Sequence, residues 1–317
     1  MSSNSKSPRA TVLVFSCDQY EDAWYPFFTL MDKFWVDCPY RILLNTESKA
    51  CSVLLNHIKV DTLQLYMEGE NIPYGKRCLD HLKHINTEYV ITLMDDFFIR
   101  SDVDTATLER IMDWMDKDET IASFCLLHHD DRHSCRYLRE ERGYENFSLR
   151  PRYCNHNYDM QACIWRKKAY QKTWRSFMNP WEWEGPANYR SFDDGYKYFD
   201  LDDDAHFPID YIDYKKHEWS GIRKGKWVKE TVCELFDKNG ISIDYSKRGF
   251  YDEQSDPTSG GQSFWGLLRE IRCYGWRRVI PASFYKLTRY IRAHYFGEKG
   301  LPENYCEALR HKYYDKV

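Results

Sequence analysis

Long hydrophobic runs are missing from this sequence. The longest apolar segments, such as 11–15 and 89–94, are far shorter than the roughly 20 residues that a membrane-spanning helix needs. Residues 1–9 are polar and lack the apolar core of a signal peptide. The sequence therefore predicts a polar N-terminal tail at 1–9, no transmembrane helix and a cytoplasmic location.

Paired cysteine spacings and internal repeats are also missing. The 11 cysteines are an odd number and none form a Cys-x-x-Cys pair, which argues against a disulfide framework or a zinc knuckle. No repeat period is visible. An aromatic content of 17% excludes a disordered chain. The 317 residues are enough for one large domain or two.

Strand and helix signals alternate through the first 127 residues. Short apolar or β-branched runs predict strands at 11–15, 40–44, 62–65, 89–94 and 121–127. Apolar residues at helical spacing predict helices at 24–35, 75–86 and 104–116. This alternation favours an α/β fold with a mostly parallel sheet flanked by helices. Ligands of such folds bind beyond the carboxyl ends of the strands, which places Asp18 and the pair Asp95–Asp96 at one rim.

Between about 130 and 250 the signals are irregular, and the segment is rich in Tyr, Trp, Asp and Asn. Such stretches on a rigid sheet are typical of binding loops. The acidic residues at 193–194 and 200–204 have no strand leading into them, which indicates a solvated loop. The run 128–133 is either a polar loop at the entrance of the site or, through its His-x-x-x-His spacing, a metal-binding pair.

The sharpest feature is the run from Ile91 to Phe98, a buried strand that leads directly into Asp95 and Asp96. An unpaired buried charge costs several kcal/mol, so these carboxylates need a cation, a basic partner or solvent. Mg²⁺ or Mn²⁺, bound by one or two carboxylates together with substrate phosphates, satisfies that need. The alternative is that the two aspartates only cap a following helix.

The strand that ends in Ser16-Cys17-Asp18, the helix at 75–86 and the strand that runs into Asp95-Asp96 together resemble a known family. They are similar to the nucleotide-sugar half of GT-A fold glycosyltransferases, which have a Rossmann-like mixed sheet, with Asp95-Asp96 at the position of the metal-binding DxD motif. More narrowly, residues 10–250 resemble bacterial glycosyltransferases encoded with capsule and exopolysaccharide assembly genes. This sequence has Asp-Asp-Phe where many relatives have Asp-x-Asp.

The resemblance implies roles for four residues of the rim. Asp96 would be the main ligand of Mn²⁺ or Mg²⁺, and Asp95 would contact the ribose, or the metal through water. Ser16 and Asp18 of the first loop would help to hold the nucleotide of the donor.

The segment Asn179-Pro-Trp-Glu182-Trp-Glu184-Gly185 places two acids among tryptophans and resembles the acidic acceptor-side segment of the family. Inverting transfer needs a general base, and a carboxylate in a partly apolar setting suits this role. Glu184 is the predicted base, with Glu182 as the second candidate. Alternatively, both tryptophans belong to the core and one glutamate is merely exposed.

The segment 221–227 combines two glycines with three cations. Glycine lets the backbone approach an anion closely while Arg and Lys neutralise it. We expect Arg223 and Lys226 to contact the pyrophosphate of the donor, and His217 to be a further metal or phosphate contact. A basic surface turn is the alternative.

The stretch 264–295 contains seven lysines and arginines against one acid, and apolar residues at helical spacing on either side of Pro281 predict two amphipathic helices. Such helices bind anionic membrane surfaces. Two alternatives are packing on the catalytic domain and nucleic-acid binding; the negative charge of the remaining chain argues against the second. We therefore expect a membrane-associating region at 251–317 and no nucleic-acid partner.

These expectations combine into one function: a metal-dependent transferase at the inner face of the plasma membrane. It would move a sugar from a nucleotide-diphosphate sugar, by family habit a UDP-sugar, to a lipid-linked oligosaccharide acceptor in cell-surface polysaccharide synthesis. Two alternatives stay open. A nucleotidyltransferase would need a glycine-rich basic loop after the first strand, where this chain has Ser16-Cys17-Asp18-Gln19. A carbohydrate-binding protein would account for the aromatic residues but not for Asp95–Asp96.

Overall fold

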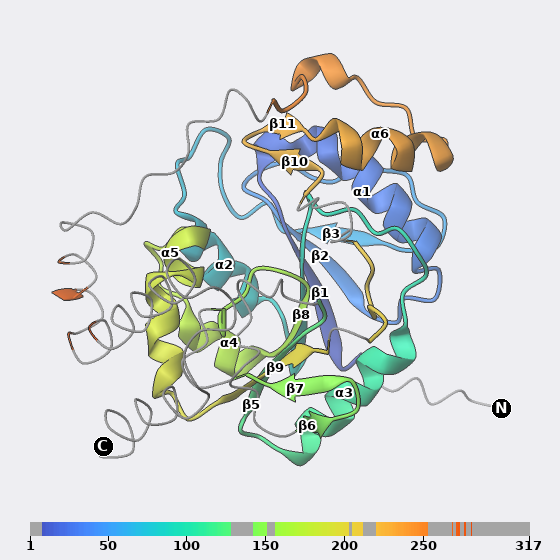
Figure 1. The fold of residues 1–317 in the computed structure, drawn as a ribbon. Helices are drawn as coiled ribbons and strands as arrows, with labels where there is room; N and C mark the ends of the chain where they lie inside the picture. The colour runs from blue at the N-terminus through green and yellow to red at the C-terminus, as the bar shows by residue number, and fades with distance from the viewer. Residues whose placement is uncertain are drawn as a thin grey trace, which may run out of the picture.

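The computed structural model describes residues 8–127, 142–150, 156–202, 205–211 and 220–252, together with Leu268, Ile271, Arg272, Trp276 and Ile280. The described part is built on a nine-stranded sheet of order β3-β2-β1-β4-β8-β5-β9-β7-β6 (Figure 1). Its strands are β1 (Ala10–Phe15), β2 (Arg41–Asn45), β3 (Val60–Thr62), β4 (Tyr89–Met94), β5 (Ile121–Cys125), β6 (Arg142–Tyr144), β7 (Phe147–Leu149), β8 (Cys163–Arg166) and β9 (Lys197–Leu201).

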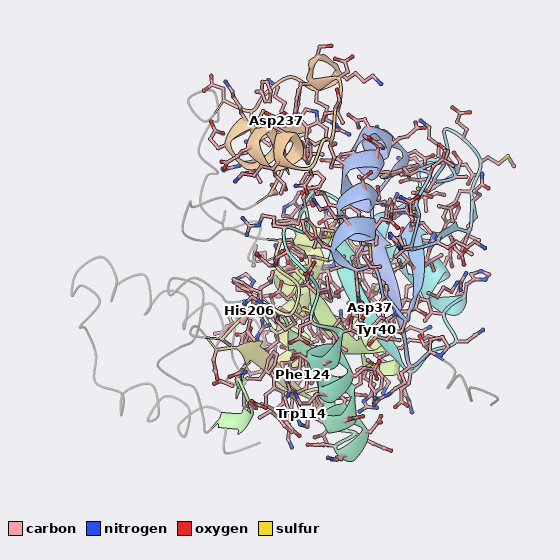
Figure 2. All side chains as sticks on the ribbon, turned by 90° about the vertical axis from the view of Figure 1, so that its right-hand side faces the viewer. Asp37, Tyr40, Trp114, Phe124, His206 and Asp237 are labelled. Carbon is pink, nitrogen blue, oxygen red and sulfur yellow. The ribbon has the colours of Figure 1, made fainter. Side chains whose placement is uncertain are left out.

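Helices flank the sheet, and a short hairpin stands beside it (Figure 1). The helices are α1 (Glu21–Phe34), α2 (Tyr74–Lys83), α3 (Thr105–Lys117), α4 (Lys167–Thr173), α5 (Pro180–Glu184) and α6 (Lys229–Lys238), and the hairpin pairs β10 (Ile222–Arg223) with β11 (Lys226–Trp227). In Figure 2 Trp114 of α3 lies close to Phe124 of β5, and their ring centroids are 5.9 Å apart. The expected α/β architecture with a mixed sheet flanked by helices is confirmed.

The parallel part of the sheet brings the ends of distant strands together. β1 pairs with β2 and with β4 in parallel, and the last residue of β1, Phe15, lies opposite Met94, the last residue of β4. Ser16 and Asp95 therefore follow these strands at the same level of the same edge. The expectation that the first loop and the aspartate pair share one rim is confirmed for these two residues.

Strand β8 was missed in the segment expected to be irregular. It pairs antiparallel with both β4 and β5, and its burial is complete. Four residues, Cys-Ile-Trp-Arg, show no alternation of polar and apolar side chains, because both faces of the strand are covered. Its partners are far away in sequence, so no local signal could reveal it.

The acidic stretch around residue 200 was expected to be a solvated loop, and this prediction is wrong for Asp200 and Asp202. Asp200 belongs to β9, is buried and pairs with the guanidinium of Arg150, which also lies 3.2 Å from Asp159. Asp202 is buried as well and accepts a hydrogen bond from Ser148. Arg150 thus compensates the burial of two carboxylates, Asp159 and Asp200. The run of acidic residues in the sequence does not reveal this partner.

The alternative that Asp95 and Asp96 cap a helix is excluded. The next helix, α3, begins at Thr105, and its cap is Asp104, whose carboxylate accepts a hydrogen bond from the amide of Thr107 at 2.9 Å.

Little of the C-terminal region lies within the described residues. Leu268, Ile271, Arg272, Trp276 and Ile280 are helical, and all but Ile271 are exposed. Among the described helices, none is long and apolar enough to span a membrane. The predictions for the His-x-x-x-His run at 128–133, for His217 and for most of 253–317 lie outside the described residues.

The buried Arg150 generates a stability prediction. Replacing Arg150 with Ala should lower the free energy of unfolding by about 3–5 kcal/mol, because Asp159 and Asp200 would stay buried without their cation. Urea unfolding measures the change. The matched control is Lys197→Ala, which removes an exposed pair with Asp118 and should cost less than about 1 kcal/mol. Similar small losses in both variants would contradict the role given to Arg150.

Candidate active site

The candidate site begins with a chain of hydrogen bonds at the shared edge of β1 and β4. Ser16 follows β1, and its Oγ donates to the carboxylate of Asp95, which follows β4. The indole Nε1 of Trp24, on α1, donates in turn to the Ser16 Oγ at 2.7 Å. The amide of Asp95 donates to the carbonyl of Phe15 at 3.2 Å. Asp95 is only 3% exposed, so these contacts fix its carboxylate in one orientation.

The two neighbouring aspartates are in an unfavourable environment for negative charge. Burial, and then the charge of Asp96, raise the pKa of Asp95 well above its ordinary value. Burial raises the pKa of Asp96 to about 7. The Asp96 Oδ1 is buried and has no hydrogen-bond partner among the described residues. A buried carboxylate oxygen without a donor, beside a second carboxylate, fits a hard divalent cation such as Mg²⁺ or Mn²⁺.

Two arginines that the sequence analysis did not select stand near this pair. Their charges lower the pKa of Asp95, against the larger effect of burial. Arg77, on α2, is buried and pairs with Glu47. Arg248 pairs with Asp22 and donates to the carbonyl of Gln19 at 2.8 Å. Neither arginine belongs to a motif, and each comes from a segment far from residue 95, so only the fold could identify them.

Asp18 shapes the loop after β2. Its carboxylate accepts hydrogen bonds from the amides of Glu47, Ser48 and Lys49 and from the Ser48 hydroxyl. Its own amide donates to the Glu47 carboxylate at 2.6 Å. Because Glu47 also pairs with Arg77, Asp18 helps to hold Arg77 in place. These contacts leave its predicted role with the nucleotide untested.

The basic hairpin is attached to the same rim. The amide of Gly221 donates to the carbonyl of Asp96 at 2.6 Å, and a Cβ at this glycine would lie 2.2 Å from the ring of Phe98. At the other end of the hairpin, Arg248 donates to the carbonyl of Gly225 at 3.2 Å. Figure 1 shows β10 and β11 next to the first turn of α1.

Arg223 and Lys226 lie directly opposite each other on the hairpin, and both are exposed. The turn between them contains Lys224 at φ 51° and Gly225 at φ 77°, a left-handed pair that explains the glycine there. The hairpin therefore presents two cations from an element bonded to Asp96, which agrees with an anion site.

Glu184 ends α5, and aromatic contacts connect this helix to the edge of the sheet: Trp183 stacks on Trp174, Trp174 lies 5.6 Å from Tyr74, and Tyr74 lies 5.6 Å from Phe15. The amide of Met160 donates to the Glu184 Oε1 at 2.8 Å. Tyr74, at the start of α2, has a pKa raised well above its ordinary value, first by burial, then by Cys78, and then by the charges of Asp95, Asp96 and Glu184. The Tyr74 hydroxyl is buried without a partner among the described residues. Aromatic contacts thus connect α5, which carries Glu184, to the sheet edge that carries Ser16 and Asp95; the role of Glu184 stays a prediction.

Glu182 has a different position. It forms a capping box at the start of α5: the Asn179 side chain accepts from the Glu182 amide at 2.8 Å, and the Glu182 carboxylate accepts from the Asn179 amide at 3.2 Å. Trp183 is fully buried and stacks on Trp174 with ring centroids 4.7 Å apart. The core interpretation is therefore confirmed for Trp183 and is wrong for Trp181, which is 78% exposed.

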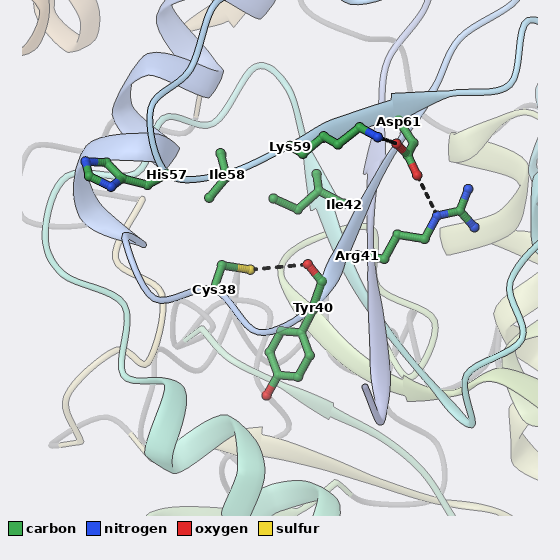
Figure 3. A pocket seen from close by; sticks show the side chains of 8 residues that line it. All are labelled: Cys38, Tyr40, Arg41, Ile42, His57, Ile58, Lys59 and Asp61. Atoms are coloured by element: carbon green, nitrogen blue, oxygen red, sulfur yellow. Dashed lines mark hydrogen bonds and ion pairs between the residues drawn. The ribbon is translucent and has the colours of Figure 1, made fainter. Parts of the chain in front are cut away.

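The described residues also contain a second group of possible metal ligands and a hollow. Cys125, Asp159 and Cys163 offer ligand atoms within 4.8 Å of one another, but Arg150 already pairs with Asp159. A hollow of about 210 Å³ (Figure 3) lies at the start of β2 and β3. Its eight lining residues are Cys38, Tyr40, Arg41, Ile42, His57, Ile58, Lys59 and Asp61, and none of them is a predicted site residue.

Comparison with known proteins gives likeness to solved structures only; no protein-family model and no curated protein matches the chain. The chain is similar to residues 1–349 of TarS from S. aureus, at 12% identity and a TM-score of 0.41, over 90% of this chain and 81% of that one. A second TarS structure matches at 12% identity and a TM-score of 0.42, over 89% of this chain and 54% of that one.

A further match is the mannosyltransferase PcManGT from Pyrobaculum calidifontis, in complex with GDP-Man and Mn²⁺, at 10% identity and a TM-score of 0.42. The match covers 97% of this chain and 80% of the PcManGT chain. GDP-Man and Mn²⁺ are the ligands of PcManGT in that complex.

The raised pKa of Asp96 predicts a pH-dependent stability. Because the folded state holds a proton that the unfolded state releases near pH 4, the stability that this proton contributes is present below pH 4 and is lost as the pH rises through about 7. In metal-free protein, the free energy of unfolding of wild type minus that of Asp96→Asn should therefore decrease as the pH rises between these two values. Thermal or urea unfolding across the range measures it.

The matched control is Asp102→Asn. The Asp102 carboxylate is exposed, so this variant shows what the loss of a surface carboxylate does by itself. Parallel pH profiles for Asp96→Asn and wild type would contradict the buried, unpaired state of Asp96.

Proposed function

We propose that this protein is a metal-dependent glycosyltransferase. It moves a sugar from a nucleotide-diphosphate sugar, with UDP as the expected nucleotide, to a lipid-linked oligosaccharide in cell-surface polysaccharide synthesis. The observation that carries the proposal is the Asp96 Oδ1, buried and without a donor beside a second carboxylate. A fold tolerates such an arrangement where a cation compensates it during function.

Asp95 and Asp96 would hold the cation together with the diphosphate of the donor. Once bound, a divalent cation supplies positive charge to the diphosphate. Arg223 and Lys226 add cations from the hairpin, and the bond from Gly221 to the Asp96 carbonyl keeps that hairpin beside the pair. As the bond between the sugar C1 and the diphosphate oxygen breaks, these fixed charges stabilise the leaving group. His217 stays a predicted further contact.

Glu184 is the proposed general base. The bond from the Met160 amide orients its carboxylate, and the contacts of Trp183 with Trp174 and of Trp174 with Tyr74 hold α5 next to the start of α2. Glu184 takes the proton of the acceptor hydroxyl while that oxygen forms a bond to C1. The diphosphate leaves with the electron pair of the bond that breaks between C1 and its oxygen. Attack opposite to the leaving group inverts the configuration at C1. Ser16 and Trp24 keep Asp95 fixed during this step.

The C-terminal region would hold the enzyme at its lipid-linked acceptor. Leu268, Trp276 and Ile280 are exposed, and Arg272 is exposed between them. Apolar side chains mixed with cations suit an anionic membrane surface. We therefore propose peripheral association of residues 264–295 with the inner face of the plasma membrane.

Nucleotide binding tests the donor part of the proposal. UDP, GDP and CDP are titrated calorimetrically into wild type and Asp96→Ala, with and without Mn²⁺. One diphosphate should bind to wild type in a Mn²⁺-dependent manner, and Asp96→Ala should lose at least about tenfold in affinity, since the variant would lack the main residue that would hold the cation. Absence of binding by all three, from protein with a cooperative unfolding transition, would contradict the proposal and favour a carbohydrate-binding protein.

The base is tested with the pair Glu184→Gln and Glu182→Gln. The readout is slow transfer of the sugar to water, followed as release of nucleoside diphosphate. Glu184→Gln should lower kcat by about 100-fold or more, because general-base catalysis is lost, while Glu182→Gln should affect mainly the cap of α5, at about 1 kcal/mol of stability. The reverse order of kcat values would assign the base to Glu182.

A further inference from the structure

The two tryptophans of α5 have opposite environments. Trp183 is fully buried, stacked on Trp174 at 4.7 Å and on Tyr158 at 5.3 Å. Trp181 is 78% exposed, and Phe177, four residues before it, is 62% exposed. An exposed indole forgoes one of the largest gains in burial that a side chain offers. Two such residues close together in sequence mark a surface that needs an explanation.

The position of Trp181 is rigid. The capping box of Asn179 and Glu182 fixes the first turn of α5. The buried Trp183 packs this helix onto the core. The amide of Gly75, on α2, donates to the carbonyl of Met178 at 2.7 Å. A Cβ at Gly75 would lie 2.1 Å from the carbonyl oxygen of Arg175, so this glycine permits the close approach. Figure 1 shows α5 and α2 side by side.

Trp181 also lies next to the candidate site. Residues three apart on a helix are neighbours on one side of it, with Cβ atoms about 5–6 Å apart, and Trp181 and Glu184 have this spacing on α5. Trp183 of the same helix stacks on Trp174, whose ring lies 5.6 Å from that of Tyr74, and Tyr74 in turn lies 5.6 Å from Phe15, the residue before Ser16. The exposed indole is therefore one helical turn from the proposed base.

We infer that Trp181, with Phe177, is the stacking platform of a pyranose subsite for the acceptor. The assignment to the acceptor rests on the proposed function; sugar binding itself does not. A pyranose ring presents an apolar face that packs on an indole, and its hydroxyls donate hydrogen bonds to carboxylates, here Glu184.

The charge of α5 selects among possible occupants. The helix itself carries two acids and no cation, which disfavours an anionic sugar directly beside Glu184, while the exposed Arg175 lies two residues before Phe177. A neutral or amino-substituted pyranose is compatible with this charge. The structure thus assigns a different ligand to Trp181 than to Trp276, which is 63% exposed in the basic C-terminal stretch.

Fluorine NMR of the full chain labelled with 5-fluorotryptophan tests this assignment. Trp181→Phe and Trp276→Phe identify the two resonances, and Trp276 is the matched control for an exposed indole. The labelled protein is titrated with cellotriose, triacetylchitotriose and mannotriose, and separately with vesicles of phosphatidylglycerol. At least one trisaccharide should shift the Trp181 resonance with saturation and leave Trp276 unmoved, whereas the vesicles should broaden Trp276 and spare Trp181.

The subsite is overturned if no trisaccharide moves the Trp181 resonance, if Trp276 moves equally, or if the vesicles broaden Trp181 instead. A calorimetric titration of the responding sugar should show at least about tenfold weaker binding to Trp181→Ala and wild-type binding to Tyr25→Ala, whose ring is exposed on α1. Failure of the proposed function is read separately: sugar binding at Trp181 without Mn²⁺-dependent nucleotide binding would keep the subsite and reject the transferase.

Discussion

At the carboxyl end of β4, Asp95 and one carboxylate oxygen of Asp96 are held out of water, and contacts from several segments fix this arrangement. Asp95 is fixed by Ser16 and, through it, by Trp24. Asp96 has an oxygen with no donor among the described residues. The resulting rise in the pKa of both groups, caused first by burial, costs stability at neutral pH. Such a cost is typical of a site that is completed by its ligand.

The compensating charges come from segments that are far apart in the chain. Arg77 reaches the rim from α2, where Glu47 and Asp18 organise the loop that holds it. Arg248 binds Asp22 and also the carbonyl of Gly225, so one side chain connects the first helix to the basic hairpin. Burial and the charges of Asp96 and Asp95 raise the pKa of Tyr20, next to Arg248, to about 12. Arg77 and Arg248 are therefore both paired with carboxylates of the protein, and each still lowers the pKa of Asp95.

The sequence was informative where the signal is local and uninformative where it depends on distant partners. The strand at 89–94 was predicted correctly, because a buried strand is a continuous apolar run. Asp95 and Asp96 follow it directly, and their role as metal ligands stays a prediction. β8 was missed because its four residues acquire meaning only between β4 and β5. The burial of Asp200 depends on Arg150, 50 residues away in the chain. The two tryptophans of α5 are identical in the sequence pattern, and only packing separates the core residue from the exposed one.

The proposed binding of a divalent cation by Asp96 can be measured by anomalous diffraction from a crystal grown with Mn²⁺ and a nucleoside diphosphate. We expect a Mn²⁺ peak within coordinating distance of the Asp96 carboxylate. That peak should be absent in Asp96→Asn and present in Cys125→Ser, which removes a potential ligand from the other cluster. A peak at Cys125, Asp159 and Cys163, or diphosphate bound beside Asp96 without metal, would show that Asp96 is not a metal ligand.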